Sequence, residues 1–140
     1  MRYVWLALSV LLVLVIFYNS LMSGSESGRL SALLASWLEA MAPFLQLEGG
    51  VEHTIRKLAH FCEFALLCWL LCKTFSAFWI SKRTSDGYIF FLCLFVAVID
   101  EYIQLYSPGR SALLSDVMLD FSGAFCMWLS YRIWNWTDNF

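Results

Sequence analysis

The chain has 140 residues, of which 61% are hydrophobic and only 14% are charged, and its formal net charge is -2. A soluble domain of this length cannot hide so many apolar side chains, so the composition excludes an ordinary soluble protein and predicts an all-α integral membrane protein. The few charged residues form no basic stripe, which excludes nucleic acid as a partner.

The first predicted transmembrane helix covers residues 3–22. Its central stretch, YVWLALSVLLVLVIFY, is uncharged, and with the residues that follow it reaches the ~20 residues that cross a hydrocarbon core. A cleaved signal peptide is the alternative, because Arg2 supplies a short charged start. We favour a permanent span, since no small-x-small cleavage site follows and the apolar stretch is long for a signal peptide.

The segment after this span predicts an amphipathic helix over about residues 28–47. Beginning at Leu30, apolar residues recur at i, i+3, i+4, i+7, i+8 and i+11, until Pro43 disturbs the pattern. Two placements stay open for this helix: on the outer membrane surface, or packed against the other helices.

Three more spans are predicted over residues 58–80, 88–106 and 113–134. The motif SPG separates the last two, because Pro108 restricts the backbone and the following glycine accepts turn conformations that other residues resist. We therefore expect a bundle of four transmembrane helices that forms a single domain, residues 1–140.

The placement of lysine and arginine predicts that both termini are cytoplasmic, because short loops with positive charge stay on that side of the membrane. Basic residues lie near the amino terminus, around the loop after the second span and near the carboxyl terminus: Arg2, Lys73, Lys82, Arg83 and Arg132. With this orientation Arg56, Lys57 and Arg110 lie outside, and we interpret them as functional exceptions.

The cysteines all fall inside apolar runs and show no CxxC spacing. Free cysteine behaves as a small hydrophobic side chain, so we expect all of them to be buried core residues. They are Cys62, Cys68, Cys72, Cys93 and Cys126.

Most of the remaining ionisable residues fall at one end of the predicted bundle. When four spans alternate in direction, the start of the second, the end of the third and the start of the fourth meet at the same surface. The residues brought together in this way are Arg56, Lys57, His60, Glu63, Asp100, Glu101, Gln104, Arg110, Asp116 and Asp120. An ionised side chain facing lipid costs ~2.5 to 3.5 kcal/mol, so we expect these groups to face one another in a polar pocket near the outer surface.

Helical spacing supports this pocket. Asp100 and Gln104 lie four residues apart, and Asp116, Asp120 and Gly123 follow i, i+4 and i+7 on a single face. The glycine leaves a groove in which another helix can approach closely.

The leading interpretation of the pocket is a binding site for an anionic headgroup. Arg56, Lys57 and Arg110 suit a lipid phosphate or sugar phosphate, while the carboxylates and Gln104 suit hydroxyls or an amine.

A second interpretation is a membrane-embedded, metal-dependent hydrolase or transferase. Its candidate catalytic residues are His60, Glu63, Glu101 and Asp116, with Asp120 beside them. One imidazole with oxygen ligands suits zinc or manganese. Since the spacing His-x-x-Glu is a weak signal, the sequence assigns no metal ligand and predicts no cofactor.

A third interpretation is a structural scaffold or partner subunit whose helices are joined by ion pairs. The expected pairs join Arg110 to Asp116 or Glu101, and Arg56 to Glu63.

Two stretches, RKLAHFCEFALL and DEYIQLYSPGRSALLSDVMLDFSGA, follow a first span that ends in NSLMSGSES, and together they make the chain resemble the VanZ-like family of small bacterial membrane proteins. The resemblance covers essentially the whole chain. The three family elements map onto Lys57, His60 and Glu63; onto Asp100, Glu101 and Gln104; and onto Gly109, Arg110, Asp116, Asp120 and Gly123. Phe64 is a departure, because many relatives carry tyrosine there.

This resemblance implies a multi-pass protein of the bacterial cytoplasmic membrane with a role in the cell envelope. The founding member of the family is associated with low-level resistance to the glycopeptide teicoplanin. The implied partners are membrane lipids and a lipid-linked cell-wall precursor or glycopeptide-like ligand. The resemblance supplies no reaction, so whether the protein is an enzyme stays open.

Overall fold

The computed structural model describes residues 1–22, 51–108 and 112–137. Within these ranges the secondary structure is all α-helix. The helices are α1 (Arg2–Leu21), α3 (Val51–Ala77), α4 (Lys82–Gln104) and α5 (Leu114–Thr137). The all-α prediction is confirmed for this part of the chain, whereas the amphipathic helix predicted over residues 28–47 lies outside the described residues.

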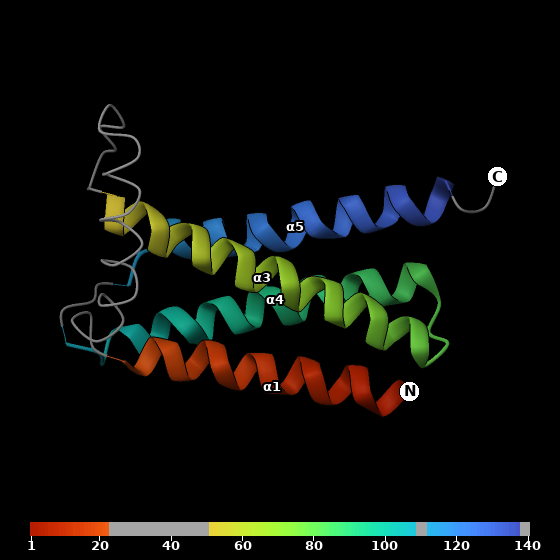
Figure 1. Cartoon of the computed structure of the whole chain (residues 1–140), viewed down its shortest axis with the longest axis horizontal. Coiled ribbons are helices and arrows are strands. Elements are labelled where there is room, and N and C mark those ends of the chain that lie inside the picture. The colour runs from red at the N-terminus through yellow and green to blue at the C-terminus, as the bar shows by residue number, and fades with distance from the viewer. Residues whose placement is uncertain (23–50, 109–111, 138–140) are drawn as a thin grey trace.

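Successive described helices run in opposite directions along the long axis of the bundle (Figure 1). As a result α1 and α4 finish, and α3 and α5 begin, at the same end of the molecule, which we call the site end. This is the arrangement that the sequence predicted for the polar residues.

Two helices begin earlier than hydropathy predicted. α3 begins at Val51, whereas the predicted span begins at residue 58, and α4 begins at Lys82, whereas the predicted span begins at residue 88. The backbone of a helix satisfies its own hydrogen bonds, so a helix can continue beyond its apolar stretch into a polar segment. At α4 the cap is explicit, because the Ser81 hydroxyl accepts a hydrogen bond from the Thr84 backbone N–H at 3.3 Å.

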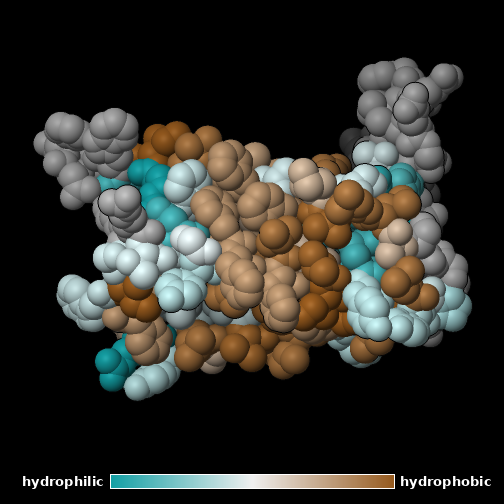
Figure 2. Space-filling model, turned by 180° about the vertical axis from the view of Figure 1, so that it is seen from behind, coloured by the Kyte–Doolittle hydropathy of each residue, from teal (hydrophilic) through white to brown (hydrophobic). Residues whose placement is uncertain are grey.

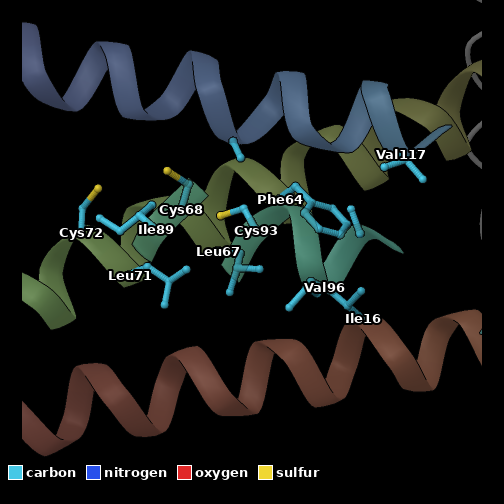
Figure 3. Packing of buried hydrophobic residues seen from close by; sticks show 12 residues of the cluster. Ile16, Phe64, Leu67, Cys68, Leu71, Cys72, Ile89, Cys93, Val96 and Val117 are labelled. Atoms are coloured by element: carbon cyan, nitrogen blue, oxygen red, sulfur yellow. The ribbon is translucent and has the colours of Figure 1, made fainter. Parts of the chain in front are cut away.

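The core is apolar and lies between the helices, where Figure 3 shows side chains of all four elements pointing toward one another. Phe64 and Ile16 are fully buried there. Three of the thiols also lie in this core, as predicted: Cys68, Cys72 and Cys93. The prediction is wrong for Cys62 and Cys126, which lie exposed on the outside of the bundle.

The outside of the bundle is also apolar. Figure 2 shows hydrophobic residues across the middle of one face, with hydrophilic residues toward both ends. Large side chains such as Leu14, Phe91 and Phe95 are exposed. Among the described residues, two helices are long and apolar enough to cross a membrane: α1 and residues His53–Ala77 of α3. Together these features indicate a membrane protein, because exposing such a large apolar surface to water is energetically unfavourable.

Gly123 of α5 packs directly against the backbone of α3. Among the described helices, α3 and α5 share the most extensive contact. A Cβ atom added at Gly123 would collide with the Phe61 carbonyl oxygen, and it would lie 3.1 Å from the Phe61 carbonyl carbon. The groove predicted at this glycine is therefore occupied by the backbone of α3.

Replacing Gly123 by alanine should destabilise the bundle. The obstructing atoms belong to backbone, so α3 must shift as a whole, and overpacking of this kind costs about 1–3 kcal/mol. Thermal unfolding in detergent measures the effect. The matched control is Gly87→Ala, because Gly87 has nothing within 4 Å of the added Cβ and alanine is the better helix former. Equal unfolding temperatures for Gly123→Ala and wild type would contradict the packing argument.

Candidate functional site

The carboxylate of Asp100 on α4 lies at the site end and is 0% exposed. It accepts hydrogen bonds from the Ser20 hydroxyl of α1 at 2.5 Å and from the Gln104 side-chain amide at 2.9 Å. Its Oδ2 atom also lies 3.8 Å from His60 Nδ1 on α3. Asp100 therefore links three helices from inside the bundle.

His60 lies between two carboxylates. Its Nδ1 is 3.8 Å from Glu63 Oε2, one turn further along α3, and equally far from Asp100. These distances are too long for hydrogen bonds, and His60 Nδ1 is a buried atom with no hydrogen-bond partner. Glu63 in turn accepts a hydrogen bond from Asn19 of α1 at 3.1 Å.

A fourth helix, α5, contributes Asp120. This α5 side chain is 1% exposed, and its Oδ1 atom also has no hydrogen-bond partner. One ligand-type atom from each of His60, Asp100 and Asp120 lies within 4.8 Å of the other two. The two residues whose polar atoms are unpaired, His60 and Asp120, thus face the same small region as Asp100.

Above this cluster lies a cavity that opens at the site end, which we call the mouth pocket. Cationic side chains stand at its rim. Lys57 Nζ lies 3.1 Å from Asp116 Oδ1, and Arg56 Nη2 lies 3.2 Å from His53 Nδ1. The pocket is lined by His53, Arg56, Lys57, His60, Glu101, Gln104, Leu113, Asp116, Leu119 and Asp120.

Two hydrogen bonds fix helix ends near the pocket. The Glu101 side chain accepts from the Leu113 backbone N–H, immediately before α5, at 2.9 Å. The Ser107 hydroxyl donates to the Ser20 carbonyl oxygen, near the end of α1, at 2.6 Å. Each bond satisfies a backbone group that a helix terminus leaves without an intrahelical partner.

Most of the predicted pocket residues do meet at the site end. Arg56, Lys57, His60, Glu101, Gln104, Asp116 and Asp120 line the mouth pocket. Asp100 and Glu63 lie against His60, while Arg110 falls outside the described residues.

One expected ion pair is wrong: Arg56 contacts His53, and Glu63 binds Asn19 and faces His60. The two partners of the expected pair lie seven residues apart on α3, and each finds a nearer group.

Sequence reasoning missed Asn19, Ser20 and His53. The first two are polar residues that close an otherwise apolar span, and His53 stands one turn before Arg56 on α3. Their polar character and helical spacing are visible in the sequence. Helix periodicity within one span, however, cannot identify a partner on another span.

The opposite end of the bundle offers a contrast. There Asp86 pairs with Arg132 and also accepts a hydrogen bond from the Trp128 indole at 2.8 Å. Lys73 lies over the rings of Trp69 and Tyr131, 5.7 and 5.6 Å from their centroids. This end has conventional pairing of opposite charges, unlike the buried cluster at the site end.

Replacing Ser20 by alanine should destabilise the protein by about 1–2 kcal/mol, because a buried carboxylate loses a hydroxyl donor. Ser20→Ala should destabilise the protein less in an Asp100→Asn background than in wild type, since the carboxylate charge that strengthens the hydrogen bond is then absent. Unfolding midpoints of the two single variants and the double variant measure this coupling. Ser115→Ala, at an exposed position of the same end, is the control. Fully additive effects would contradict the bond.

Residues 5–135 match the family model described as VanZ/LLP1. No curated protein and no solved structure matches the chain. The matched residues include α3, α4 and most of α1 and α5, and they contain the residues that line the mouth pocket. The chain therefore belongs to the VanZ-like family, VanZ/LLP1.

Proposed function

We propose that this protein is a multi-pass protein of the bacterial cytoplasmic membrane whose mouth pocket binds an anionic, lipid-linked headgroup at the outer leaflet. The observation that carries the proposal is the layered charge of the pocket. Cations stand at its rim, and carboxylates with an amide lie deeper.

The rim supplies the phosphate contacts. Arg56 and Lys57 are both partly exposed, and Arg56 has no carboxylate partner among the described residues. A guanidinium with free donors binds a phosphate in the fork geometry that it uses for carboxylates. Lys57 already holds Asp116, so an incoming phosphate would share this lysine with that carboxylate or displace it.

The inner wall suits the polar remainder of a headgroup. Gln104, Glu101 and Asp120 line the pocket below the rim. Carboxylates accept hydrogen bonds from hydroxyls and amines, which are the groups that sugars and amino sugars present.

An apolar groove near the pocket suits the hydrocarbon tail of a lipid-linked ligand. This groove runs along α1, α3 and α4 from Leu6 and Val10 to Phe17 and Ile99, near the site end. A ligand with its headgroup in the mouth pocket would keep its tail against this groove or in the surrounding lipid.

Removing the rim cations should weaken binding of a polyprenyl phosphate. The double variant Arg56→Gln, Lys57→Gln should lose affinity by about tenfold or more, which corresponds to about 1.4 kcal/mol. The wild-type affinity should fall with added salt. Calorimetry in nanodiscs with this lipid measures both effects. Lys73→Gln, which removes a cation at the opposite end, is the matched control.

Equal binding of polyprenyl phosphate and the uncharged polyprenol by wild type would contradict the headgroup proposal. We also propose that ligand binding contributes to glycopeptide resistance, as the family association suggests. In a strain that depends on the protein, the double variant should then lower teicoplanin tolerance while the protein still accumulates.

The orientation can be tested independently of any ligand. In a background with Cys62→Ser and Cys126→Ser, a membrane-impermeant maleimide should label Ser115→Cys in intact cells. It should label Thr84→Cys only after permeabilisation, because the start of α4 lies at the opposite end of the bundle. Both positions are exposed. The reverse labelling pattern would place the mouth pocket in the cytoplasm and contradict the proposal.

A further inference from the structure

We propose that His60, Asp100 and Asp120 bind one divalent transition cation, Zn²⁺ or Mn²⁺, at the base of the mouth pocket. The site uses one imidazole nitrogen and two carboxylates from three different helices. Binding of the cation itself is independent of the headgroup function proposed above.

The geometry is close to that of a metal centre. The three candidate ligand atoms lie within 4.8 Å of one another. Metal–nitrogen and metal–oxygen distances of about 2.0–2.2 Å place neighbouring ligand atoms roughly 3–3.5 Å apart, so modest side-chain rotations would bring the three onto a common ion.

Two buried atoms without hydrogen-bond partners indicate a cation-binding site. His60 Nδ1 and Asp120 Oδ1 are both buried without a hydrogen-bond partner, and Asp120 as a whole is 1% exposed. In native proteins nearly all buried polar atoms form hydrogen bonds, so two such atoms without a partner at the same location require an explanation. Both atoms are Lewis bases that a single cation satisfies together.

Charge supports the same assignment. Asp100 and Asp120 are almost completely buried, and within the described part of the chain no lysine or arginine forms an ion pair with Asp120. At the opposite end Asp86 does have such a partner in Arg132. Buried carboxylates are stable when they are paired or when they coordinate a metal, and a divalent cation offsets two of them at once.

Supporting contacts already orient the ligands. Ser20 and Gln104 donate to Asp100, as outer-shell groups do in metal sites. Glu63 Oε2 lies beside the cluster, 3.8 Å from His60 Nδ1. Gly123 allows α5 to approach the backbone beside His60, which brings Asp120, one turn earlier, toward that histidine.

The donor set selects the class of ion. One imidazole with carboxylates suits zinc or manganese, whereas soft cations prefer thiolates, and the cluster contains none. His60 and Asp120 also line the mouth pocket. A headgroup oxygen would therefore complete the coordination, and this extension alone rests on the proposed function.

The test is metal binding by the full-length protein in detergent without added lipid. After removal of metal by a chelator, wild type should bind one equivalent of Zn²⁺ or Mn²⁺ in calorimetry and elemental analysis. Asp120→Asn, an uncharged isostere, should reduce the affinity by at least about 100-fold, since even outer-shell substitutions cost 10–100-fold. His60→Gln should do the same. Asp86→Asn, at the opposite end, is the matched control and should bind as wild type does.

Two further readouts separate loss of the site from loss of the fold. The bound ion should raise the unfolding temperature of wild type but not that of Asp120→Asn. Pulsed electron paramagnetic resonance of Mn²⁺-loaded wild type should show coupling to a histidine nitrogen, and it needs no variant. The proposal is overturned if wild type binds neither ion, if both ligand variants keep wild-type affinity, or if no nitrogen coupling is seen. Because lipid is absent, none of these results depends on headgroup binding.

Discussion

The structure depends on one electrostatic constraint: a carboxylate buried in an apolar bundle must be met by donors or by positive charge. Asp100 illustrates this constraint, since it accepts hydrogen bonds from Ser20 of α1 and from Gln104 in the next turn of α4. Removing either partner would leave a buried charge poorly solvated, which costs more than the bond itself contributes. The hydrogen bond from Ser20 to Asp100 thus positions the carboxyl end of α1 against α4.

The two ends of the bundle meet this constraint differently. At one end Asp86 has an arginine and an indole N–H, and the charges are paired within the protein. At the site end the cations stand at the rim, while Asp120 and His60 keep unpaired atoms below them. Within the described part of the chain Asp120 has no cationic partner, whereas Asp86 is paired with Arg132. This asymmetry favours a binding role for the site end over the scaffold interpretation.

Close helix packing and the polar cluster support each other. Gly123 lets α5 lie against the backbone of α3 at Phe61, next to His60. The apolar core that includes Phe64 fills the space further along the same two helices. The cluster of His60, Asp100 and Asp120 therefore lies at the site end, beside the opening of the mouth pocket and outside the apolar core. Phe64 itself is fully buried, so its ring serves packing, and the tyrosine hydroxyl expected in many relatives has no equivalent here.

Periodicity and composition were sufficient to predict the helices, the alternating directions and the grouping of His60, Asp100 and Asp120 at one end, because each depends on local spacing and on the cost of exposing charge to lipid. The helices begin at Val51 and Lys82, before the predicted spans, since hydropathy marks only the apolar stretch and backbone hydrogen bonding can extend beyond it. The bond from Ser20 to Asp100 and the pairing of Lys57 with Asp116 join residues that are 80 and 59 positions apart in the chain. Such partners follow from the rotation and depth of each helix against its neighbours, and those are set by packing of the whole bundle.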